Sequence, residues 1–229
     1  MILLWLFLNM ILRLIITMIV ISLSYLLSNE LSQEFTITRI KYSGGGDWYA
    51  DPSSIVNLLE FIQDETGIKT TNKEIRASVG SSEFYNNSYY YITGHGNIKF
   101  NSDERNLLRS ALLNGAFLHA DDNYGMDKSF RKEMKEIFPD KDWVELPYNH
   151  EIFNIFYKFK NGLPKIHEHD NKPPQALALF HEEKIIVLYT YESDLGDGWE
   201  DINVHNHTLK LHNDALKMGT NIAIYYLKN

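Results

Sequence analysis

Two predicted β-strands each end in side chains that can exchange protons. His95 follows the first strand, and Asp121 and Asp122 follow the second. Loops that leave the carboxyl ends of neighbouring parallel strands open onto one crevice, so these side chains are expected to face a common cleft. Together with His150 they are the candidate catalytic acids and bases. The alternative interpretation is that they cap the helices that follow.

Further residues near these loops are candidate ligand contacts. Gly94 and Gly96 flank the histidine and permit backbone conformations that bring a ligand close. Asp127 and Arg131 lie four residues apart on a predicted helix, where a structural ion pair is the alternative to ligand binding. Trp199 lies in an acidic loop of the kind that binds carbohydrate, although the glycines there are also typical of a plain turn.

The segment KIHEHD, residues 165–170, is a candidate metal site. In an extended conformation His167 and His169 project to one side of the chain. Imidazole nitrogen and carboxylate oxygen, the latter here from Asp170, are the usual non-sulfur ligands of a zinc-type divalent ion. His150 or His181 would add a further ligand. The chain has nine histidines, so a chance pair is the competing explanation.

The composition excludes several classes of chemistry. The chain has no cysteine, which removes disulfides, thiolate metal sites and a cysteine nucleophile. Its formal net charge is −8 at pH 7, the wrong sign for neutralising phosphates along a nucleic acid, so no nucleic-acid partner is expected. Hydrophobic residues at 44% and charged residues at 23% are typical of a globular protein with a buried core.

The first 32 residues differ from the rest of the chain. Residues 1–28 are almost wholly apolar and carry Arg13, a pattern typical of a signal peptide or of an uncleaved membrane anchor. No A-x-A cleavage site follows, so both alternatives stay open. Residues 33–229 are expected to form a single α/β domain, either exported to the periplasm or cell envelope or anchored at the inner membrane by an N-terminal apolar helix.

Strands and helices alternate along this domain. Strands are predicted over residues 35–42, 89–93 and 116–120, and helices over residues 51–67, 102–115 and 127–138. Residues 177–180 and 184–191 are predicted to form an antiparallel hairpin. The tail is predicted to be helical over 209–216 and either helix or strand over 220–227. The alternation predicts a mostly parallel sheet covered on both faces, with antiparallel additions at an edge.

Several sequence motifs occur in order from Phe35 to the C-terminus. They are ITRIKYSGGGDW, YITGHG, ADDNYGMDKSFRKEM, IFPD, LPYNH, LPKIHEHD and YESDLGDGW. In these motifs the chain closely resembles a bacterial family, domain of unknown function 4159. The resemblance implies a flavodoxin-like, class I glutamine amidotransferase-like three-layer sandwich, in exported proteins encoded beside membrane-associated envelope proteins. It implies no established activity. Asp121 and Asp122 stand where amidotransferases carry their cysteine nucleophile, so thiolate-dependent glutamine hydrolysis is not expected.

Three functions remain open from the sequence. The first is a non-catalytic binding or assembly module that contacts membrane-associated envelope proteins. The second is a hydrolase or carbohydrate-active enzyme that uses histidine and aspartate, with or without a divalent metal. The third is a sensor that binds a small ligand in the crevice near Trp199.

Overall fold

The structure is a computed structural model that describes Trp5, residues 10–20, Ser22 and residues 34–229. It divides into two units, Met1–Phe35 and Thr36–Asn229. In the first unit residues 10–20 are helical. Within the described part of the chain, no helix combines the length and the apolar character that crossing a bilayer requires. The signal peptide or anchor expected over residues 1–32 falls largely outside the described residues.

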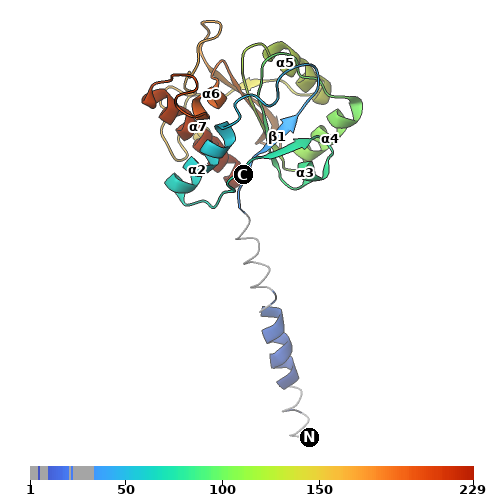
Figure 1. Ribbon diagram of the computed structural model, residues 1–229. Coiled ribbons are helices and arrows are strands. Elements are labelled where there is room, and N and C mark those ends of the chain that lie inside the picture. Colours follow the sequence, from blue (N-terminus) through green and yellow to red (C-terminus); the bar gives the residue numbers. More distant parts are fainter. Residues whose placement is uncertain (1–4, 6–9, 21, 23–33) are drawn as a thin grey trace. The chain divides into compact units, whose positions relative to one another are not determined.

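The second unit is built around a seven-stranded sheet (Figure 1). In chain order its strands are β1 (Thr38–Lys41), β2 (Ile75–Ser78), β3 (Tyr89–Ile92), β4 (Phe117–Asp121), β5 (Val144–Glu145), β6 (Gln175–His181) and β7 (Lys184–Tyr191). Across the sheet the order is β2-β1-β3-β4-β7-β6-β5. The first five strands in this order pair in parallel, whereas β6 and β5 are antiparallel additions at one edge. The predicted sheet is thereby confirmed.

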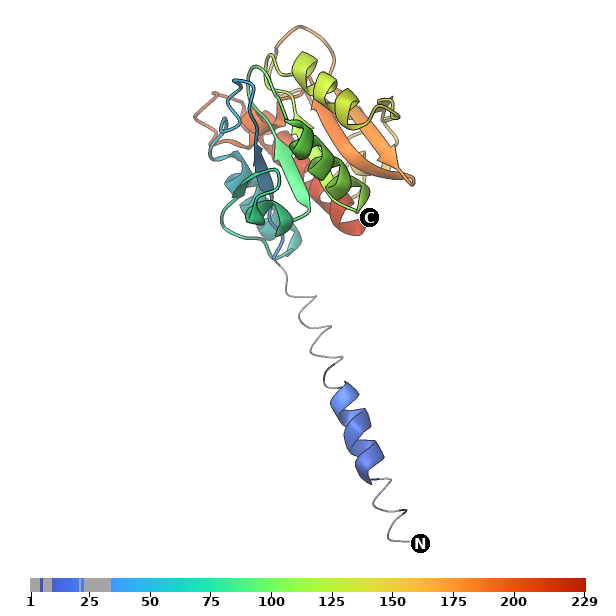
Figure 2. The same cartoon turned by 90° about the vertical axis from the view of Figure 1, so that its right-hand side faces the viewer.

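Helices cover both faces of this sheet (Figures 1 and 2). They are α2 (Ser54–Thr66), α3 (Ser82–Tyr85), α4 (Ser102–Leu113), α5 (Asp127–Ile137), the 3-10 turn η1 (Glu151–Phe153), α6 (Leu195–Trp199) and α7 (Leu209–Lys228). One face carries α2, α6 and α7, which pack against one another, and the other carries α3, α4 and α5. The mixed α/β architecture follows the alternation of strands and helices in the sequence.

Strand β3 shows why the sheet is buried on both faces. All four of its residues are buried, as expected for a parallel strand between two helical layers. The Tyr90 ring stacks on Phe84 of α3, with ring centroids 4.5 Å apart. The next residue, Tyr91, points to the opposite face and lies 5.4 Å from the Trp199 ring of α6. The hydrophobic core therefore forms two layers, one on each side of the strands.

Local signals fix several helix ends. Helix α4 begins with a capping box in which Asn101 and Glu104 exchange side-chain and backbone hydrogen bonds. Helix α2 ends at Gly67, which adopts the left-handed conformation that glycine tolerates. The tail, for which helix and strand were both open beyond residue 220, is one continuous helix, α7. The acidic loop around Trp199, for which a plain turn was the leading interpretation, is the buried helix α6.

Candidate metal centre

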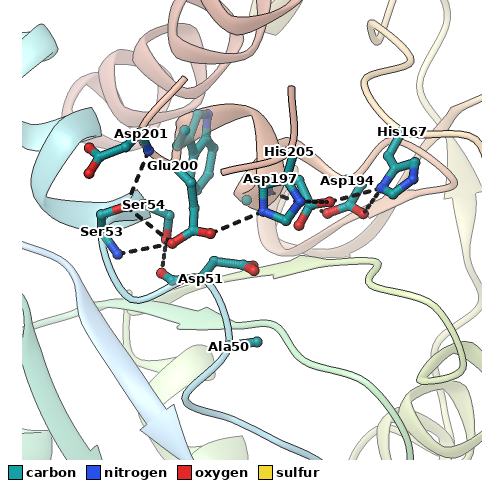
Figure 3. Close-up of polar contacts among 12 residues, drawn as sticks. Ala50, Asp51, Ser53, Ser54, His167, Asp194, Asp197, Glu200, Asp201 and His205 are labelled. Atoms are coloured by element: carbon teal, nitrogen blue, oxygen red, sulfur yellow. Dashed lines mark hydrogen bonds and ion pairs between the residues drawn. The ribbon is translucent and has the colours of Figure 1, made fainter. Parts of the chain in front are cut away.

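Five buried carboxylates gather at the carboxyl ends of the parallel strands, and Figure 3 shows four of them, Asp51, Asp194, Asp197 and Glu200. Asp51 follows β1, Asp121 ends β4, and Asp194, Asp197 and Glu200 follow β7. Each of the five residues is 6% exposed or less. Buried carboxylates are costly unless they are paired, hydrogen-bonded or bound to a metal, so their partners identify what this cluster can do. The five are called the acidic cluster below.

The short helix α6 brings two of these carboxylates into place. Asp194 adopts a left-handed conformation, and its Oδ1 accepts the Asp197 N–H at 3.4 Å. The Gly196 N–H donates to Asp121 Oδ2 at 2.6 Å, which ties α6 to the end of β4. A Cβ atom on Gly196 would lie 2.6 Å from Asp51 Oδ2, so only glycine allows the backbone to approach the carboxylates this closely.

Asp197 is at the centre of the contacts with histidine. Its Oδ2 lies 2.9 Å from His167 Nδ1 and 3.2 Å from His205 Nδ1. The other ring nitrogen of His205 lies 3.0 Å from Glu200 Oε2. Glu200 is itself held through its Oε1, which accepts the backbone N–H of Ser53 at 3.2 Å. A single carboxylate therefore contacts imidazoles from two separate segments of the chain.

Two further histidines border the acidic cluster. His169 Nε2 lies 3.0 Å from Asp194 Oδ2, and the ring centroids of His167 and His169 are 5.2 Å apart. His207 stacks on His205, with centroids 5.5 Å apart. Burial lowers the pKa of both His169 and His207, and neutral imidazole is the form that binds metals. Both His-x-His pairs thus lie along one border of the cluster.

The charges in the acidic cluster are only partly compensated by the protein, since the buried Arg39 lowers the pKa of Asp51 without pairing with its carboxylate. In the described part of the chain its carboxylates form ion pairs only with histidines, never with lysine or arginine. Burial raises the pKa of Asp51 and of Asp194 well above the usual range, and the neighbouring Asp197 carboxylate raises both further. Burial also raises the pKa of Asp121 to about 6, although hydrogen bonds from Thr190 and α6 oppose this. A bound cation would relieve this repulsion.

Two sets of side chains have the spacing of metal ligands. One consists of His167, Asp197 and His207, and the other of Asp51, Asp197 and His205. Within each set the potential ligand atoms all lie within 4.8 Å of one another. Nitrogen and oxygen ligands of this kind suit Zn²⁺, Mn²⁺ or Fe²⁺. Asp197 is common to both sets, so its carboxylate would be a ligand at either position.

Asn123 provides an independent indication of a ligand. The residue is fully buried, and its Nδ2 donates to Asp51 Oδ2 at 3.2 Å, so the amide lies against the acidic cluster. Its Oδ1 is buried and has no hydrogen-bond partner among the described residues. Buried amide oxygens are rarely left unsatisfied in folded proteins. This buried oxygen therefore lacks a protein partner beside the acidic cluster, where a water or a cation would satisfy it.

A family model described as "Domain of unknown function (DUF4159)" matches residues 36–227. The chain belongs to this family. No curated protein matches the chain. The family description names no activity, so the function of the DUF4159 domain has to be inferred from the geometry of its site.

The DUF4159 domain brings only some of the predicted site residues together. Asp121, His167 and His169 all contact the acidic cluster. His95 instead lies with its Nδ1 3.1 Å from Asp47 Oδ2, and its side chain is 55% exposed. Among the described residues no hydrogen bond or ion pair joins His95 to Asp121, and the expectation that they face one cleft stays a prediction. Strands β3 and β4 are parallel neighbours as predicted, and the His95 side chain contacts the loop after β1, which also carries Asp51.

Four predicted residues lie around a neighbouring cavity of about 280 Å³. Asp122, Asp127, His169 and Asp170 are among its lining residues. Asp122 points away from Asp121, and its Oδ2 accepts the backbone N–H of Glu192 at 3.1 Å. Asp170 is exposed and pairs with a lysine, so it lies outside both ligand sets.

The remaining predicted residues have structural roles. Arg131 pairs with Asp127 at 2.6 Å within α5, the ion pair that was the alternative to ligand binding. His150 Nδ1 accepts the Ile152 N–H at the start of η1, so it acts as a cap. Trp199 is fully buried and donates to the Ala215 carbonyl at 2.8 Å, which leaves its ring closed to a ligand.

The glycines beside His95 serve the packing of the loop. A Cβ atom on Gly94 would lie 2.3 Å from the Tyr42 hydroxyl and 2.7 Å from the Asp47 carbonyl oxygen, so glycine is required there by the protein itself. Gly96 has a φ of +84° and lies beside Gly125 of the loop after β4. These positions are explained without a ligand.

Sequence reasoning did not predict several residues of the centre. It assigned Asp194, Asp197 and Glu200 to an acidic loop for which a plain turn was favoured, and it gave no site role to Asp51, Asn123, His205 and His207. One signal was present in the sequence, because His205 and His207 repeat the His-x-His spacing of His167 and His169. Two such pairs in one chain are more specific for a metal than one pair.

Proposed function

We infer that the DUF4159 domain binds two divalent cations in the acidic cluster and uses them in a metal-assisted hydrolysis. The observation that carries this proposal is that Asp197 belongs to two sets of ligands at once. Carboxylate-bridged pairs of ions are a recurring arrangement in hydrolytic enzymes, where the ions activate water and stabilise the charge that develops on the substrate. The position beyond the carboxyl ends of parallel strands is where α/β domains bind ligands.

Hydrolysis needs no reactant beyond water. The water oxygen forms the new bond to the substrate, the bond to the leaving group breaks, and the leaving group takes up a proton. In this site the carboxylates and imidazoles hold the ions, while α6 fixes Asp197 through its hydrogen bond with Asp194. The buried position of the carboxylates excludes bulk water from their side of the site.

The test is a metal titration of the full-length chain after treatment with a chelator. Calorimetry with Mn²⁺ or Zn²⁺, together with elemental analysis after dialysis, should give two ions per chain. Asp197→Asn should lose both ions, whereas Asp51→Asn and His207→Gln should each lose one. His150→Gln, which changes a histidine outside the cluster, is the matched control and should bind two.

The outcomes of this titration are decisive if the variants keep the circular dichroism of the native fold. Binding of two ions by Asp197→Asn, or of none by the unaltered chain, would refute the proposal. The hydrolysis is tested separately, by release of alcohol from a panel of phosphate and carboxylate esters by the metal-loaded chain. Asp197→Asn is the inactive reference.

A non-catalytic module that binds membrane-associated envelope proteins is the second candidate. It is supported by Asp121, whose carboxylate oxygens both accept hydrogen bonds, from Thr190 and Gly196, at the strand end where the family resemblance suggests a nucleophile. The absence of cysteine from the chain points the same way. A metal-loaded chain that hydrolyses nothing but retains a specific partner from bacterial membranes would favour this candidate.

Two broader proposals accompany the function. The strand order β2-β1-β3-β4-β7 supports a flavodoxin-like arrangement, and with it the kinship to class I amidotransferases. The apolar character of residues 1–28 supports export to the bacterial envelope or anchoring at the inner membrane. Cell fractionation and N-terminal sequencing of the mature protein test the second of these, since a cleaved signal removes about the first 30 residues.

A further inference from the structure

A cavity of about 470 Å³ lies between residues 157–165 and the first turns of α7. Its lining contains five lysines and one acid, although the chain as a whole carries a net charge of −8. The lysines are Lys158, Lys160, Lys165, Lys210 and Lys217. This lysine cavity is thus a basic hollow on an acidic chain.

Not all of the lysine charge is balanced by neighbouring groups. Lys165 pairs with the buried Glu192 at 2.9 Å, and Lys210 pairs with Asp214 at 2.6 Å. Lys158 and Lys160 form no ion pair with any residue that the structure describes. These two ammonium groups are therefore available to a ligand of opposite charge.

The wall of the cavity is held in a defined conformation. Asn221 of α7 is fully buried, its Oδ1 accepts the Tyr157 N–H at 2.8 Å, and its Nδ2 donates to the Tyr157 and Ile152 carbonyls. The opposite wall is the N-terminal end of the 20-residue helix α7, whose dipole adds partial positive charge. The lysines of the cavity therefore extend from segments whose backbone is held by these hydrogen bonds and by α7.

The lysine cavity is a site separate from the candidate metal centre. Lys165 lies two residues before His167, and Lys210 lies three residues after His207, so the two sites share segments of the chain. None of the proposed metal ligands lines the cavity, and between the shared segments Gly198 of α6 packs closely against Ile166 and Ala215.

We propose that the lysine cavity binds a phosphate dianion, either inorganic phosphate or the phosphate group of a soluble monoester. A phosphate dianion matches two unpaired ammonium groups in charge, and its oxygens accept several hydrogen bonds at once. This proposal does not rest on the metal-dependent hydrolysis.

The experiment titrates the chelator-treated full-length chain with inorganic phosphate and with phenyl phosphate. Without metal, any binding reports on the lysines alone. The double variant Lys158→Gln/Lys160→Gln should weaken both affinities about tenfold or more, and added NaCl should weaken binding to the unaltered chain. Lys69→Gln/Lys73→Gln removes two exposed lysines elsewhere and should bind phosphate as the unaltered chain does.

Two further arms separate this proposal from its alternatives. Vesicles of phosphatidylglycerol and phosphatidylcholine test a lipid headgroup as the source of phosphate, and binding to vesicles without binding of either soluble phosphate would overturn the proposal. Equal phosphate affinity of the Lys158→Gln/Lys160→Gln variant and the unaltered chain would also overturn it. Asp197→Asn should still bind phosphate without metal, so a failure of the metal centre leaves this result intact.

Discussion

The carboxyl group of Asp122 should make the metal-free protein less stable as the pH rises. Asp122 is 4% exposed, and burial raises the pKa of its carboxyl from the usual 3.8 to about 7. The folded state therefore keeps this proton at a pH where the unfolded chain has already lost it. As a result, the free energy of unfolding falls as the pH rises from about 4 to about 7.

The size of the effect follows from the same pKa. Each tenfold change in proton affinity is worth about 1.4 kcal/mol, so a pKa raised to about 7 corresponds to about 4 kcal/mol. Asp122→Asn keeps an oxygen that can accept the Glu192 N–H but carries no charge. The variant should therefore be more stable than the unaltered chain at pH 8 by about 2 to 4 kcal/mol.

Urea unfolding in the presence of a chelator, at pH 4.5 and pH 8, measures this prediction. The free energy of unfolding of both proteins should fall between pH 4.5 and pH 8, because burial also raises the pKa of Asp121. The fall should be smaller for the Asp122→Asn variant. Asp170→Asn, which removes an exposed carboxylate from the same cavity, controls for the change in net charge. Equal losses in the Asp122→Asn variant and the unaltered chain would refute the reasoning.

Two substitutions in α6 test how the helix positions the centre. A Cβ atom on Gly198 would lie 2.4 Å from Ala215 Cβ and 2.9 Å from Ile166 Cγ2, so Gly198→Ala should cost about 1 to 3 kcal/mol and weaken metal binding. Unchanged melting and metal affinity would contradict this. Trp199→Phe removes the indole N–H that donates to the Ala215 carbonyl and leaves part of a fully buried site unfilled, so it should cost about 1 to 3 kcal/mol in urea unfolding. A cost below about 0.5 kcal/mol would show that the hydrogen bond contributes little.

The fold was predictable from the sequence wherever local signals agree with tertiary packing. Helices α2 and α4 carry a terminating glycine and a capping box, and β3 and β7 are continuous apolar runs. Strand β2 was missed because it has only four residues, of which Ala77 alone is buried. Helix α6 was missed because two of its five residues are glycines, and contacts with α7 rather than helix propensity stabilise it.

The centre was harder to predict because its residues resemble those of ordinary turns and helix ends. Asp51 precedes Pro52 and Ser53, a pattern typical of the start of a helix. In the structure, however, its Oδ2 accepts a hydrogen bond from the Asn123 side-chain amide and does not cap α2. Asp197 lies between two glycines, a pattern typical of a turn. The structure explains those glycines by close packing against carboxylates and against α7. Of the residues at the centre, Asp121 was singled out because it ends a strand, and His167 and His169 were singled out by their spacing.

The place of β7 in the sheet has a consequence for how the protein is made. Leu118 of β4 pairs with Val187 of β7, so the edge of β4 has no neighbour until the final third of the chain leaves the ribosome. During that interval a row of free backbone donors and acceptors is open to other nascent chains. Closing such a distant pairing is slow, which makes this the stage of synthesis at which a chaperone would help most.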